Sequence, residues 1–179
     1  MDWASVCTAI ETAVKSASGL TSVVWENRSQ TYTGPQVAKL SMSDIETVGI
    51  DDIRWADAAA PAVGQVETRV GWRRFGITVT VESQAQGATS AARAYAERLS
   101  TRIWFGSYQT AFDAVLLGLE DVSDVKEADR ARDGRMVSVA SVELRFSYTN
   151  VEADSDHPVS TIESVDLAST LTGGIHVAG

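Results

Sequence analysis

Three residues toward the carboxyl end have the types and spacing of a small metal or acid–base site: Asp154, Asp156 and His157. Two carboxylates one residue apart and an imidazole are suitable ligands for a transition metal. However, no second His or Cys lies nearby, and no glycine closes a calcium-type loop. The chain also lacks a Gly-x-Ser-x-Gly nucleophile elbow. We therefore interpret these residues as a loop and predict no catalytic residue, metal or cofactor, with a small enzyme built on them as an alternative.

A second group with chemical potential lies at residues 71–76, where two glycines enclose Trp72, Arg73, Arg74 and Phe75. The glycines lack the spacing and the helix start of a phosphate-binding loop. Two arginines beside two aromatic rings can bind nucleic acid by charge and stacking, so a nucleic-acid-binding module is another alternative. The net charge of −9 counts against it, because binding to duplex DNA needs a basic surface.

The negative charge is concentrated in the second part of the chain. From residue 110 onward there are 13 acidic and 5 basic residues, a balance of −8 out of −9. The last 30 residues contain five acids and no base. This pattern is typical of a solvated surface, or of an acidic surface facing something that must not adhere to it.

Composition predicts an ordinary globular domain of 179 residues, with 44% hydrophobic and 22% charged residues. The single cysteine, Cys7, excludes an intramolecular disulfide. No apolar run is long enough to span a membrane, and the first residues lack the pattern of a signal peptide. We expect a soluble protein of a reducing compartment, with one domain over residues 1–170 and a flexible end over 171–179.

Hydrophobic patterns predict an α+β domain with a mainly antiparallel sheet and helices packed on one face. Two of the predicted strands pair as a long hairpin, with residues 49–64 as a long projecting connection between them. The predicted elements are a helix over 2–18, strands over 23–25, 36–48 and 66–82, helices over 90–105 and 109–117, a strand over 135–149, and a last short strand or extended arm over 162–167.

The tryptophans and a leucine-rich run carry further expectations. Trp3 and Trp104 fall on apolar stripes of predicted helices and are expected in the core, as are residues 115–117. The other tryptophans stand at strand starts or beside the long connection, where exposed aromatics mark protein interfaces or cover sheet ends. They are Trp25, Trp55 and Trp72.

Several local sequences occur in a familiar order. A strand ending ITVTVESQ over 77–84 precedes a helix that contains AARAYAERL over 91–99. The stretch LGLEDVSDV follows over 117–125, and IESVDL closes the series over 162–167. Together with the order of elements, these features resemble the neck or tail terminator proteins of long-tailed bacteriophages. The resemblance spans residues 1–170, without 49–64.

The resemblance implies a structural virion protein with neither catalysis nor a cofactor. Its subunits assemble into a ring, expected to contain six copies, that caps the tail tube and stops its polymerisation. The other face of the ring docks the neck or head-completion protein, and DNA passes through the bore without specific binding. The expected location is the top of the virion tail, after assembly in the host cytoplasm, with no membrane partner. A head–tail joining protein or another tail protein is the alternative in this class.

A ring subunit needs one patch that binds a different patch on its neighbour. The tip of the predicted hairpin and the carboxyl-terminal arm are the available extensions, and an arm can add a strand to a neighbour's sheet. An acid-lined bore would repel the DNA backbone, so that DNA slides through it. The expected interface residues are Asp51, Asp52, Arg54, Trp55, Trp72, Arg73, Arg74, Ile162, Val165 and Leu167.

Overall fold

The computed structural model describes residues 2–27, 35–57, 65–84, 91–132 and 135–153. The chain divides into two compact units. Unit 1 comprises Met1–Asp51 and Gly71–Asn150, and unit 2 comprises Asp52–Val70 and Val151–Gly179. The predicted domain boundary at residue 170 and the predicted strand over 162–167 lie outside the described residues.

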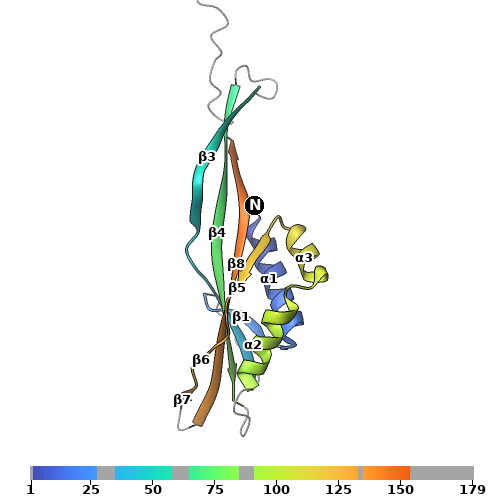
Figure 1. Ribbon diagram of the computed structural model, residues 1–179, viewed down its shortest axis with the longest axis vertical. Coiled ribbons are helices and arrows are strands. Elements are labelled where there is room, and N and C mark those ends of the chain that lie inside the picture. Colours follow the sequence, from blue (N-terminus) through green and yellow to red (C-terminus); the bar gives the residue numbers. More distant parts are fainter. Residues whose placement is uncertain (1, 28–34, 58–64, 85–90, 133–134, 154–179) are drawn as a thin grey trace, which may run out of the picture. The chain divides into compact units, whose positions relative to one another are not determined.

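Three helices belong to unit 1, and Figure 1 shows all of them on one face of the strands. They are α1 (Trp3–Ser18), α2 (Ala91–Arg102) and α3 (Gly106–Asp113). Helix α1 starts where expected, because the Asp2 carboxylate accepts a hydrogen bond from the backbone N–H of Ala4 at 3.0 Å. It ends at Gly19, whose φ of 78° is the left-handed conformation that favours glycine.

The sheet is mainly antiparallel, which confirms the predicted fold class at this level. Hydrogen bonding gives the order β1-β2-β4-β8-β5, with β3 on β4 and with β6 and β7 on β8. Strands β1 and β2 pair in parallel, whereas β2 runs antiparallel to β4, with Met42 opposite Ile77. The strands are β1 (Val23–Trp25), β2 (Gln36–Met42), β3 (Glu46–Asp57), β4 (Gln65–Ser83), β5 (Gly118–Val122), β6 (Lys126–Glu127), β7 (Arg130–Arg132) and β8 (Arg135–Ala153).

The core of unit 1 lies between the helices and one face of the sheet. Alternate residues of β4 and β8 point into it, as the sequence pattern predicted. Aromatic rings join the layers: Phe75 of β4 stacks on Phe146 of β8 at 5.6 Å between ring centroids, and Phe112 of α3 meets Phe146 edge-on at 5.1 Å. Trp3 is half-buried and forms a T-shaped contact with Phe75 at 5.6 Å between ring centroids. The fully buried large side chains are Val6, Ile10, Val14, Leu40, Phe75, Ile77, Leu99, Ile103, Phe112, Leu117, Leu144 and Phe146.

The predicted connection over 49–64 is wrong for its first part, because residues 49–57 belong to β3. The strand there is held by pairing with β4, a distant part of the chain, and its consecutive acids hide any alternation. Gly49, at a φ of 79°, lets the strand bend in a way that other residues rarely adopt. Residues 58–64 lie outside the described part of the chain.

One further expectation needs correction, and three short strands were not predicted. Residues 115–117 are only partly core, because Leu117 is buried but Leu116 is 75% exposed at a φ of 61°. The turn that follows α3 points Leu116 away from the sheet. Strands β5, β6 and β7 were not predicted, since they are short and add to β8 along its length.

Candidate interaction surfaces

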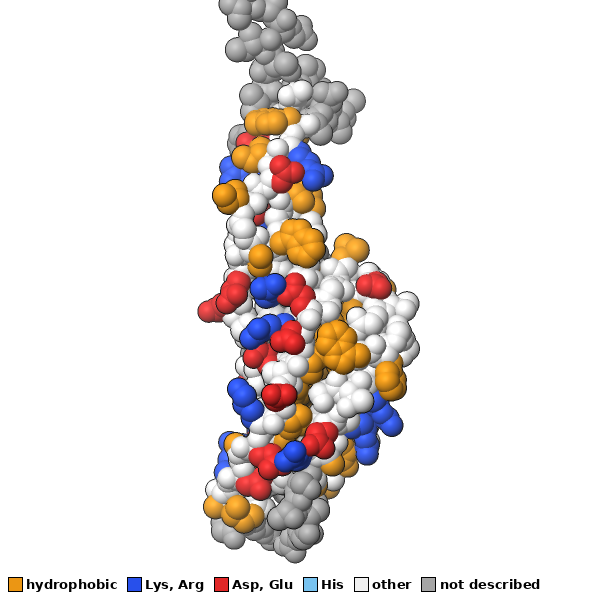
Figure 2. Space-filling view, in the orientation of Figure 1, with side chains coloured by type: hydrophobic (Ala, Val, Ile, Leu, Met, Phe, Trp, Pro, Cys, Tyr) orange, Lys and Arg blue, Asp and Glu red, His pale blue; other side chains and the backbone are white. Residues whose placement is uncertain are grey.

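The sheet of unit 1 has one face without helices, which we call the open face. Val142, Leu144 and Phe146 of β8 point toward the helices and are buried. Because successive side chains of a strand alternate, Glu143 and Arg145 point to the open face. Acidic and basic side chains are interspersed over the strands in Figure 2. The open face is therefore a charged surface, unlike the apolar face that carries the helices.

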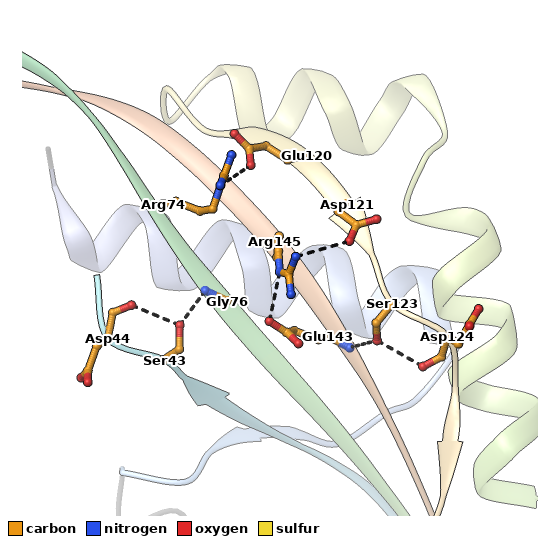
Figure 3. A network of polar contacts seen from close by, with 10 residues as sticks. All are labelled: Ser43, Asp44, Arg74, Gly76, Glu120, Asp121, Ser123, Asp124, Glu143 and Arg145. Atoms are coloured by element: carbon orange, nitrogen blue, oxygen red, sulfur yellow. Dashed lines mark hydrogen bonds and ion pairs between the residues drawn. The ribbon is translucent and has the colours of Figure 1, made fainter. Parts of the chain in front are cut away.

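Ion pairs link three strands, β4, β5 and β8, on the open face (Figure 3). Arg74 of β4 donates from Nε to Oε2 of Glu120 on β5 at 2.5 Å. Arg145 lies between two acids, with Nε 3.4 Å from Oε1 of Glu143 and Nη1 3.9 Å from Oδ2 of Asp121. The hydrogen bond from Arg74 holds the pKa of Glu120 below its usual value, against the opposing effect of burial. The same contact raises the pKa of Arg74.

Two Ser-Asp pairs of consecutive residues, which we call the serine–aspartate corners, follow β2 and β5 (Figure 3). In each, the serine continues the hydrogen bonding to the neighbouring strand beyond the strand end. Ser43 Oγ accepts from the backbone N–H of Gly76 at 2.8 Å and donates to the carbonyl oxygen of Asp44 at 3.2 Å. Ser123 Oγ likewise accepts from the N–H of Glu143 at 2.9 Å and donates to the carbonyl oxygen of Asp124 at 3.1 Å. Each serine thus fixes the loop that carries the next aspartate. Sequence reasoning missed both corners, although Ser-Asp after a strand is the signal that they share.

A bidentate ion pair joins β3 to β4 within unit 1. Arg73 donates to both carboxylate oxygens of Asp51, each at 2.7 Å, and the guanidinium side chain is 15% exposed. Gly71 provides the space, because a Cβ at that position would lie 1.9 Å from Asp51 Oδ1. Asp51 and Arg73, both expected at an interface, are thus tied to each other. Arg74 is paired with Glu120, so both arginines of the proposed nucleic-acid module have carboxylate partners.

A second cluster of charges surrounds Glu82 of β4, a carboxylate whose side chain is only 7% exposed. Lys39 of β2 donates to it at 2.8 Å, and Arg130 of β7 contacts the same oxygen. The two cations compensate a charge that would be costly to bury alone. This cluster ties the short strand β7 to β4.

Several large apolar side chains are exposed on β3 and β4. In unit 1, Ile50 is 99% exposed and Trp72 is 59% exposed; Val48 is also exposed, as is Ile45, which directly precedes β3. Among the described strands, β3 pairs with β4 alone, so its other edge is open in the described part of the chain. An open strand edge with apolar side chains is a typical surface for protein association.

Unit 2 contributes exposed residues of its own. Ile53 and Trp55 are 51% and 49% exposed. Asp52 and Arg54, two of the expected interface residues, form an exposed ion pair at 2.9 Å. A pair this exposed contributes little to stability, so both side chains are available to a partner.

Two tryptophans differ from their expected positions. Trp25 is only 4% exposed, because β1 contacts helix α1 and the ring belongs to the core cluster, and its indole N–H has no hydrogen-bond partner among the described residues. Trp104 is 47% exposed instead of lying in the core. Helix α2 ends at Arg102, so the helical periodicity that predicted its burial stops before it, and Ile103 takes the buried position.

Other predicted residues lie outside the described part of the chain. These are the Asp154, Asp156 and His157 cluster and the arm residues Ile162 and Val165, together with Leu167. Within the described ranges no group of three or more His, Cys, Asp or Glu side chains is arranged to hold a metal ion. None of the helices described is long and apolar enough to cross a membrane. No protein-family model matches the chain, and no curated protein matches it.

Proposed function

We propose that the chain is a structural subunit of a bacteriophage tail, a tail terminator that assembles into a ring of six copies. The observation that supports this best is the exposed apolar edge of β3. Ile50 is an apolar side chain that is 99% exposed, and its strand has an open edge in the described part of the chain. Both features favour association with another protein surface. Ring contacts of this kind, between one patch and a different patch of the next subunit, are what a closed ring requires.

In this proposal the ring caps the tail tube and docks the neck or head-completion protein, while DNA passes through the bore. The charged open face suits the bore. Its carboxylates, Glu120, Asp121, Glu143 and the exposed Asp44, outnumber the guanidinium groups of Arg74 and Arg145. A surface of this sign repels phosphate, whereas a basic one would hold DNA through counterion release. Neither catalysis nor a cofactor belongs to this role.

The role of the β3 edge can be tested with one pair of matched variants. Ile50→Asn puts a polar side chain on β3, and Leu116→Asn makes the same kind of change at another exposed position, after α3, where the side chain is 75% exposed. We expect Ile50→Asn to lower the mass measured by native mass spectrometry to that of one chain, while Leu116→Asn keeps the wild-type assembly. Circular dichroism controls for the fold of both. Equal assembly of both variants would contradict a role for the β3 edge.

A further inference from the structure

We propose that a groove between α2 and the end of β5 binds an arginine side chain of a partner protein. The groove encloses about 490 Å³ and belongs entirely to unit 1. This inference concerns one protein contact and does not rest on the tail terminator proposal. The groove is lined by Arg93, Glu97, Ser100, Trp104, Val122, Ser123, Asp124 and Val125.

One wall of the groove is the indole ring of Trp104. Trp104 is 47% exposed, although an indole has one of the largest apolar surfaces that burial can remove from water. Its neighbour Ile103 is fully buried and fixes the backbone from which the indole projects. Trp104 therefore remains accessible in the groove, and an accessible indole can stack on a partner's flat cation.

The segment after β5 contributes Asp124 to the groove, and its carboxylate has neither a hydrogen bond nor an ion pair among the described residues. Neighbouring acids differ, because Glu97 and Glu127 are both paired with Arg93, at 2.6 and 3.4 Å. Arg93 is thus already shared between two carboxylates. Asp124 consequently presents an uncompensated negative charge at the edge of the groove.

The loop that carries Asp124 is fixed before any partner arrives. Ser123 donates its backbone N–H to the carbonyl of Glu143 at 2.9 Å, and its hydroxyl accepts from the N–H of the same residue. Val122 and Val125, on either side, pack against the core and form the floor. A rigid site loses little conformational entropy on binding.

An arginine side chain fits this combination better than a lysine. Its planar guanidinium stacks on an indole face and donates two parallel hydrogen bonds to a carboxylate, whereas an ammonium acts as a point charge. The side chain's three methylenes would lie on the apolar floor. The groove therefore selects a protein segment with an exposed arginine.

The proposal can be tested by titrating the full chain with the blocked tripeptide acetyl-Gly-Arg-Gly-amide and following the indole N–H signals by NMR. The signal of Trp104, identified from its loss in Trp104→Phe, should shift with a Kd on the order of 1 mM, which is typical of a single side-chain contact. The citrulline tripeptide, equal in shape but uncharged, should produce no comparable shift. The lysine tripeptide should bind about threefold more weakly.

The matched variants are Asp124→Asn and Asp113→Asn, which remove an exposed carboxylate inside and outside the groove. We expect Asp124→Asn to weaken binding of the arginine tripeptide about threefold to fivefold, and Asp113→Asn to leave it unchanged. Either of two results would overturn the proposal: equal shifts with arginine and citrulline, or equal affinity for Asp124→Asn and wild type. Both variants alter exposed side chains, so their unchanged spectra elsewhere control for the fold.

Discussion

Replacing Gly71 with alanine is the sharpest single test of how β3 is held on β4. A Cβ at Gly71 would lie 1.9 Å from Asp51 Oδ1 and 2.5 Å from Arg73 Nη1, both far closer than van der Waals contact. The obstructing atoms are the two partners of the bidentate ion pair. Alanine can therefore be accommodated only if the carboxylate and the guanidinium move apart.

The size of the effect follows from the contacts that are lost. Two charge-assisted hydrogen bonds of 2.7 Å would break, between side chains that are 15% and 26% exposed. Losing hydrogen bonds of charged groups at this degree of burial costs about 2 kcal/mol. For a chain of this length that corresponds to a decrease in Tm of about 4–8 °C.

Urea unfolding followed by circular dichroism measures this change. Gly106→Ala is the matched control, because a Cβ there has no heavy atom within 4 Å, and we expect its free energy of unfolding to stay within about 0.5 kcal/mol of wild type. The double variant Asp51→Ala, Gly71→Ala adds a further check. Without the carboxylate, the atom closest to the new Cβ is absent, so Gly71→Ala should cost less than about 0.5 kcal/mol in that background.

Two results would refute this reasoning. Equal stability of Gly71→Ala and Gly106→Ala would show that the ion pair does not fill the space above Gly71. Strictly additive effects of Asp51→Ala and Gly71→Ala would show that the clash is with something other than the carboxylate.

Two further predictions concern carboxylates of the sheet. Glu82→Gln should lower the free energy of unfolding by about 2 kcal/mol, because it removes the nearly buried negative charge that Lys39 and Arg130 both contact; an unchanged urea midpoint would contradict this. Arg74 lowers the pKa of Glu120 from 4.5, so folding favours the ionised carboxylate. Wild type should therefore exceed Glu120→Gln in stability above about pH 4.5, with the difference shrinking as the pH falls below that value; a difference that grows toward low pH would contradict it.

Much of the fold could be predicted from local patterns. Helix α1 and its two ends follow from Asp2, the apolar stripe and Gly19, which act within a few residues of one another. Strand β8 follows from strict alternation over a long run. In these segments the local conformational preference and the burial of apolar side chains favour the same structure, so the sequence pattern alone predicts it.

What the sequence did not predict depends on contacts between distant residues. The continuation of β3 through Asp51 depends on Arg73, 22 positions away, and nothing near Asp51 indicates that pair. The exposure of Trp104 depends on where α2 stops, and element ends are the least certain part of any sequence pattern. The candidate groove brings Trp104 together with Asp124 from a separate strand end, a juxtaposition that only the fold creates.

The proposed role is the termination of a phage tail, and electron microscopy of lysates from a phage lacking the gene tests it most directly. We expect tails of uncontrolled, abnormally great length that carry no heads. Headless tails of normal length would instead indicate a head–tail joining role. Intact virions with tails of normal length would contradict a structural role at the neck altogether.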